Sequence, residues 1–71
     1  MNPNHEIINS RREEYPVGTR VRLILMNDPH APPVGTHGTV ICVDDMATIH
    51  VDWDTGNRLG AVWGEDIIAK L

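Results

Sequence analysis

Apolar and polar residues alternate along most of the chain after residue 15, and this period of two predicts β-strands. The expected strands cover residues 19–25, 38–43, 48–53, 58–62 and 67–71. In the first strand the pattern places Val21, Leu23 and Leu25 on one face. In the third strand, which alternates most regularly, Trp53 lies on the apolar face and is expected in the core. In an open sheet the edge strands have unpaired backbone N–H and C=O groups, and closure of the sheet into a barrel pairs them. The pattern therefore favours an all-β barrel.

The segments between these strands carry turn residues. Residues 27–35 hold three prolines and one glycine, which excludes a helix or a central strand and predicts a long, stiffened loop. Residues 44–47 and 54–57 predict tight turns, the second with Gly56 suited to a positive φ. Residues 64–66 predict a tight turn or one 3₁₀ turn. This order of elements is typical of a small five-stranded SH3-like barrel.

Residues 1–14 follow a different pattern, because the stretch from residue 5 to residue 14 is polar apart from the pair Ile7 and Ile8. Asn4 is a good N-cap, so the segment predicts either a short helix over residues 5–13 or a disordered tail. A helix this short is marginal in water unless it docks on another surface. The chain is therefore expected to consist of an N-terminal arm, residues 1–14, and a barrel, residues 15–71.

Composition and charge restrict the number of domains, the kinds of partner and the cellular location that can be expected. A chain of 71 residues is long enough for one domain and too short for a deep catalytic pocket beside a core. Its formal charge of −4 argues against a nucleic-acid partner, because phosphate backbones are bound by clustered basic side chains. No apolar run has the length of a membrane span, and the N-terminus does not resemble a secretory signal. A cytoplasmic protein with no membrane partner is expected.

Catalytic and metal-binding chemistry finds little support in the sequence. The single cysteine, Cys42, lies in an apolar run, which favours a buried, inert thiol over a nucleophile paired with His37 or His50. The acidic pair at residues 44–45 suits turn formation better than acid–base catalysis. The histidines lack the close spacing of known metal sites, although His50 and Asp52 share one strand face. No enzymatic activity, metal or cofactor is therefore expected.

Residues suited to binding a partner fall mainly in the loops. The stiffened loop and the turn after the second strand are expected to meet and to form one edge for a partner protein or a small ligand. This candidate site consists of Asp28, His30, Pro32, Pro33, Asp44, Asp45 and Trp63. A separate anion patch is expected from Arg20, Arg22 and Arg58, because the planar guanidinium suits phosphate recognition. The plainer explanations are a loop stiffened for stability and solvated surface charge.

Five segments carry a pattern shared with known sequences. With x for positions outside the pattern, they are YPVGTRV at residues 15–21, MNDPxAPP at 26–33, GTHGTV at 35–40, VDDxxxIHV at 43–51 and WDxGxxLG at 53–60. In these segments the chain resembles a family of short uncharacterised domains from Firmicute bacteria, their phages and mobile elements. The resemblance implies an SH3-like fold and a bacterial host cell, but no activity or site. The chain departs from it at Met46 and Ala47, where a glycine is expected in the turn.

These patterns favour a non-catalytic binding module that engages a host or phage protein, with inhibition of a bacterial defence protein as one specialisation. Two alternatives stay open. The first is an oligomeric sponge for a small anionic signal of the nucleotide type, which would use the arginine patch and Trp63. The second is a ribosome- or RNA-associated SH3-like barrel, because residues 35–40 are loosely similar to the Gly-x-x-Gly-x-Val segment of such proteins. Self-association as a homo-oligomer is compatible with so short a chain.

Overall fold

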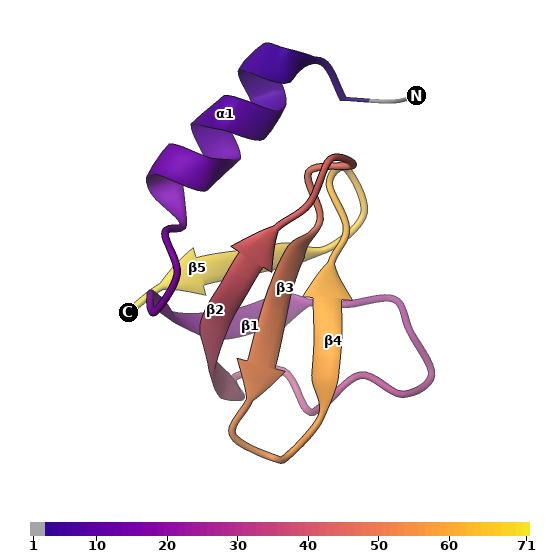
Figure 1. The fold of residues 1–71 in the computed structure, drawn as a ribbon. Coiled ribbons are helices and arrows are strands. Elements are labelled where there is room, and N and C mark those ends of the chain that lie inside the picture. The colour runs from indigo at the N-terminus through magenta and orange to yellow at the C-terminus, as the bar shows by residue number, and fades with distance from the viewer. Residues whose placement is uncertain (1–2) are drawn as a thin grey trace.

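A single antiparallel β-sheet dominates the computed structural model, which describes residues 3–71. Its five strands lie in the order β4-β3-β2-β1-β5. The chain runs through α1 (His5–Glu14), β1 (Arg20–Leu25), β2 (His37–Val43), β3 (Ile49–Trp53), β4 (Arg58–Ala61) and β5 (Ile67–Lys70). Neighbouring strands from β1 to β4 pair in sequence, and β5 returns to pair with β1 (Figure 1). The predicted strands and the mostly-β fold class are therefore confirmed.

The expected closure into a barrel is not found within residues 3–71. β4 and β5 stand at the two ends of the sheet order, and no pairing joins them. Both edge strands have only four residues. The connection between them forms a turn in which the amides of Glu65 and Asp66 donate to the carbonyl of Val62. The sheet is instead strongly bent, so that β1 and β5 run across the direction of β2, β3 and β4 (Figure 1).

The hydrophobic core fills the inside of this bend. It is formed by side chains from all five strands, namely Val21, Leu23, Val40, Val43, Ile49, Val51, Trp53, Ala61 and Ile68. Trp53 is the largest of the fully buried side chains, with 1% of its surface exposed. Its indole Nε1 donates a hydrogen bond of 3.1 Å to the carbonyl of Leu59, which satisfies the polar atom that the ring carries into the core. The prediction that Trp53 is a core residue is confirmed.

Two β-bulges change the expected pattern of inward and outward side chains. The register shifts between Leu23 and Leu25 in β1 and between Val40 and Cys42 in β2. Each bulge inserts one extra residue, so the strand after it no longer follows strict alternation. Leu25 is consequently 48% exposed, and Cys42 is exposed as well. The predictions that Leu25 faces the core and that Cys42 is buried were wrong for this reason.

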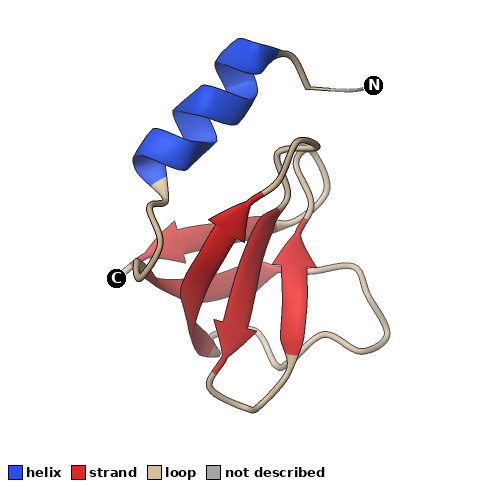
Figure 2. Ribbon diagram, viewed as in Figure 1, coloured by secondary structure: helices blue, strands red, loops and turns tan. Residues whose placement is uncertain are grey.

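Helix α1 lies over the end of β2, outside the sheet (Figure 2). The side chain of Asn4 accepts a hydrogen bond of 2.9 Å from the amide of Ile7, so the predicted N-cap is confirmed. Ile8 is the buried residue of the helix. Arg12 secures the helix further, because its Nε donates to the carbonyl of Val43 at 3.1 Å. None of the helices that the structure describes has the length and apolar character needed to cross a membrane.

The packing of Trp53 on β2 depends on the missing side chain of Gly38. A Cβ at this position would lie 2.5 Å from Val51 Cγ1 and 2.8 Å from Trp53 Cε3. We therefore expect Gly38→Ala to lower the free energy of unfolding by about 1–3 kcal/mol, because overpacking forces core side chains to move. Urea unfolding followed by tryptophan fluorescence measures this change. Thr55→Ala, in the exposed β3–β4 turn, is the control, and an unchanged stability of Gly38→Ala would contradict the packing described here.

Candidate functional site

The residues predicted to form a single edge lie in two separate places. The stiffened loop at residues 27–35, which we call the proline-rich loop, leads into β2, and the turn at residues 44–48 follows β2. The two segments therefore lie at opposite ends of that strand (Figure 1). A strand of seven residues spans roughly 20 Å. His30 lies beside the β3–β4 turn, where its carbonyl accepts a hydrogen bond of 3.2 Å from Asn57 Nδ2. The expected meeting of the proline-rich loop with the turn was therefore wrong.

The proline-rich loop is held by its own hydrogen bonds. Asp28 Oδ1 accepts from the amide of His30 at 2.7 Å. The carbonyl of Pro33 accepts from both the amide and the hydroxyl of Thr36, at 3.1 and 2.6 Å. Pro32 is buried, whereas Pro33 is exposed. In this loop the side chains of Asp28 and Pro32 stabilise the fold, which leaves less of the predicted surface for a partner.

The turn between β2 and β3 is organised around Asp44. Its Oδ1 accepts hydrogen bonds from the amides of Met46 and Thr48, at 2.9 and 3.0 Å. Its Oδ2 lies 2.7 Å from His50 Nε2. Partial burial by itself would raise the pKa of Asp44, but these hydrogen bonds outweigh it and hold the pKa below its usual value. Asp44 is therefore engaged inside the turn and presents little free charge to a ligand.

Ala47 ends this turn in an unusual backbone conformation. Its φ is +61°, in the left-handed region that favours glycine, and its side chain is fully buried. The position is one of the two at which the family resemblance led us to expect a glycine. An alanine in this region costs about 1–2 kcal/mol relative to a right-handed conformation. The hydrogen bonds of Asp44 and the burial of the methyl group offset that cost.

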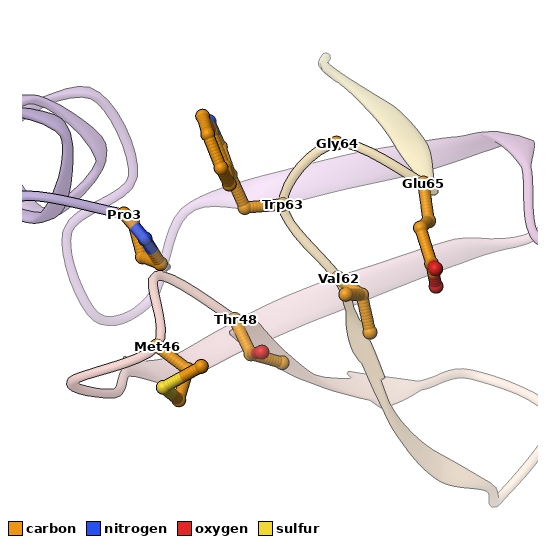
Figure 3. Close-up of a pocket in the computed structure, with 7 residues that line it drawn as sticks. All are labelled: Pro3, Met46, Thr48, Val62, Trp63, Gly64 and Glu65. Atoms are coloured by element: carbon orange, nitrogen blue, oxygen red, sulfur yellow. The ribbon is translucent and has the colours of Figure 1, made fainter. Parts of the chain in front are cut away.

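Two adjoining pockets lie on either side of Met46. The first has a volume of about 560 Å³, and its side chains come from the segment before α1, the β2–β3 turn and the β4–β5 loop (Figure 3). The second, of about 490 Å³, lies between the same turn and the first half of α1. Pro3 and Met46 line both. We call this surface the Met46 groove. Its apolar lining residues are Pro3, Ile8, Met46, Val62 and Trp63, and its polar ones are Asn4, His5, Arg12, Asp45, Thr48 and Glu65.

The Met46 groove combines apolar side chains, mainly in the first pocket, with polar and charged side chains, mainly in the second. Met46 is 52% exposed and Val62 is 38% exposed, so apolar surface is open to solvent. Asp45 at the rim is paired with Arg12 at 3.1 Å. Glu65 has no ion pair among residues 3–71, so the uncompensated charge at the rim is negative.

Sequence reasoning selected two residues of this groove, Asp45 and Trp63, and missed the others. The signal that it overlooked is Met46, a large apolar residue placed in a turn that is otherwise polar. Ile8 was visible in the sequence only as part of the apolar pair in the N-terminal arm, and Pro3 had no signal. Their approach to the turn depends on how α1 docks on β2.

The predicted anion patch does not form a free cationic cluster. Arg20 is bound by both carboxylate oxygens of Asp54, at 2.9 and 2.6 Å. This hydrogen bonding is the main reason why the pKa of Asp54 lies below its usual value. Nε of Arg58 lies 3.8 Å from Oδ1 of Asp52. Arg22 has no ion pair within the part of the chain that the structure describes. Much of the positive charge in this patch is therefore compensated.

Cys42 and His50 are neighbours on the outer face of the sheet, where they face each other across β2 and β3. Nε2 of His50 interacts with the carboxylate of Asp44. The other ring nitrogen, Nδ1, points toward β4, because a Cβ added at Gly60 would lie 3.5 Å from it. No hydrogen bond joins Cys42 to His50 among residues 3–71. In the same residues no three side chains of His, Cys, Asp or Glu are grouped as ligands for a metal ion.

Comparison with known protein families identifies a match over nearly the whole chain. A family described as a domain of unknown function, DUF4314, matches residues 4–71, which is nearly the whole chain. No curated protein and no solved structure matches the chain.

The hydrogen-bonded carboxylate of Asp44 predicts a dependence of stability on pH. Because its pKa in the folded state lies below the usual value of 3.8, its contribution to the free energy of unfolding is complete above about pH 4. That contribution is lost as the pH falls through the lower, folded-state pKa. Asp44→Asn keeps an oxygen acceptor but cannot ionise, so its stability should fall less steeply below pH 4. Urea unfolding at several pH values measures both slopes.

The control for this experiment is Glu65→Gln, which removes an exposed carboxylate that no hydrogen bond engages among residues 3–71. Its stability should follow that of the wild type over the same pH range. Equal slopes for Asp44→Asn and the wild type would show that the turn does not depend on the charged carboxylate.

Proposed function

Since the chain belongs to the DUF4314 family, whose function is unknown, we propose its function from its geometry: a non-catalytic module that binds an apolar segment of a partner protein. The observation that carries the proposal is the Met46 groove, in which two adjoining pockets share one exposed methionine. Their volumes of about 560 and 490 Å³ lie in the range of known ligand sites. Methionine adapts its shape to different apolar partners, which suits a binding surface of this kind.

The charges at the groove favour a partner segment that carries basic residues beside its apolar anchors. Glu65 at the rim has no ion pair among residues 3–71, and the whole chain has a formal charge of −4. Complementary charges of this kind speed up association and exclude acidic competitors. Buried apolar side chains of the partner would supply most of the binding energy, because aromatic and aliphatic anchors in pockets dominate protein interfaces.

We also propose that the fold is of the SH3-like kind. The order β4-β3-β2-β1-β5 supports it, because consecutive strands form hairpins and the last strand returns to the first. The tight turn before β5 and the bend of the sheet support it further. In this assignment the Met46 groove is formed at one end of the sheet by the β2–β3 turn and the β4–β5 loop. Helix α1 and the segment before it complete the groove.

The alternatives have less support from the side chains. A sponge for an anionic nucleotide requires free cations, whereas Arg20 is bound by Asp54 and Arg58 lies close to Asp52. Binding to RNA requires a basic surface with stacking aromatic rings. On the outer face of β1 to β4 positive and negative side chains alternate, so this face is not basic. Trp53 is buried, so its ring is not exposed for stacking. We propose a host or phage protein as the partner, and bacterial-defence inhibition as one setting for it.

The proposal is tested by selecting binders from a library of random linear peptides on the immobilised protein. We expect the enriched peptides to carry large apolar residues beside Lys or Arg. Met46→Glu places a charge between the two pockets, so it should weaken the selected peptides by about tenfold or more, equivalent to about 1.4 kcal/mol or more. Glu65→Arg should shift the preference from basic to acidic peptides. Dissociation constants are measured by isothermal titration calorimetry.

The matched control is Val34→Glu. Val34 is 70% exposed on the proline-rich loop, at the other end of β2, so the same change should leave affinity unaltered. Loss of binding in Val34→Glu but not in Met46→Glu would move the site to the proline-rich loop and overturn the assignment of the groove. Failure to select any peptide that binds above background would count against the proposed function itself.

A further inference from the structure

Met46 lines both pockets of the groove, so the shape of the groove depends on where this side chain stands. This side chain lies between the two pockets and is 52% exposed, so little packing around it fixes its place. Methionine has three rotatable bonds and loses much rotamer freedom when it is ordered. A groove built on such a side chain binds tightly only if the backbone beneath it is already held in the bound conformation.

The backbone on both sides of Met46 is held by Asp44. One carboxylate oxygen accepts hydrogen bonds from the amides of Met46 and Thr48, and the backbone carbonyl accepts from the amide of Ala47 at 3.0 Å. The backbone amide of Asp44 donates to the carbonyl of Thr48 at 3.0 Å. Every peptide unit that flanks Met46 is thus tied to a single residue.

Thr48 connects this turn to the opposite wall of the groove. A Cβ at Gly60 would collide with Thr48 Cγ2, so the threonine methyl lies directly over the bare backbone of β4. Thr48 also lines the first pocket, together with Val62 and Trp63 from the loop that follows β4 (Figure 3). The turn is therefore packed through one methyl group against β4, the strand that leads into the β4–β5 loop.

Ala47 has a backbone conformation that glycine would adopt without strain. Strained residues persist where the surrounding structure determines them, and they cluster at binding sites. An alanine also leaves the turn fewer alternative conformations than a glycine would. Its methyl group is fully buried, which anchors the turn to the sheet immediately after Met46.

From these contacts we infer that Asp44 and Ala47 are positioning residues of the Met46 groove. They fix the turn so that Met46 stands between the two pockets before a partner arrives. The inference rests on the proposed function, because it explains how the same groove would bind an apolar segment. Neither residue needs to touch the partner, since each acts through the backbone of the turn.

Ala47→Gly separates this role from a purely structural one. The substitution relieves the strain and removes one buried methyl group, and these effects oppose each other, so the midpoint of urea unfolding should change little. The more mobile turn should nevertheless bind the selected peptide roughly two- to tenfold more weakly, because Met46 must then be ordered on binding. Thr55→Gly adds the same freedom to the β3–β4 turn and should leave affinity unchanged.

Asp44 is tested in parallel. Asp44→Ala should weaken both peptide binding and stability, whereas Asp44→Asn, which keeps an oxygen acceptor for the amides of Met46 and Thr48, should retain near wild-type affinity at neutral pH. Amide hydrogen exchange followed by NMR reports on the turn without any peptide. We expect faster exchange at Met46 and Thr48 in Asp44→Ala and at Met46 in Ala47→Gly.

The outcomes distinguish the inference from the proposed function. If no peptide binds the wild type, the proposed function fails, and the positioning role fails with it even where exchange accelerates as expected. If peptides bind but Ala47→Gly binds them as tightly as the wild type, the inference alone is overturned. Unchanged exchange at Met46 in both variants would overturn it as well, because the turn would then be held by other contacts.

Discussion

The packing of Trp53 against the bare backbone of Gly38 is the contact on which the rest of the structure depends. The indole lies in β3, rests on β2 and donates its hydrogen bond to Leu59 in β4, so one side chain joins the three strands. A core this small has few large side chains, and Trp53 is the largest that is fully buried. A side chain at Gly38 would collide with Val51 and Trp53 and would force β2 away from β3.

The two β-bulges explain how so short a sheet encloses this core. Bulges increase the local twist and bend a strand, and here they interrupt β2, the central strand of the sheet, and its neighbour β1. The bend brings Leu23 and Ile68 over Trp53 and its neighbours without any pairing between β4 and β5. It also turns Leu25 and Cys42 outward, so the same irregularity that builds the core enlarges the apolar surface in contact with water.

The β2–β3 turn links this scaffold to the candidate site. Asp44 closes the turn from within, while Asp45 meets Arg12 of α1, which also bonds the carbonyl of Val43. The helix, the turn and the β4–β5 loop therefore meet around Met46, and each contributes a wall of the groove. That surface combines apolar side chains with an unpaired carboxylate at its rim, and this combination is the basis for proposing a protein segment as its ligand.

Local patterns in the sequence were sufficient to predict the strands and the place of Trp53 in the core, because each depends on neighbours within a few residues. For the N-terminal segment they left two alternatives, a helix capped by Asn4 or a disordered tail, and the structure has the helix. The sequence also indicated that the turn at residues 44–47 is unusual, and Ala47 does adopt a left-handed conformation. Only the tertiary structure decided which loops lie together. A bulge leaves no periodic signal, and the distance between loops is set by strand order and sheet bend, so the groove around Met46 could not be derived from the sequence.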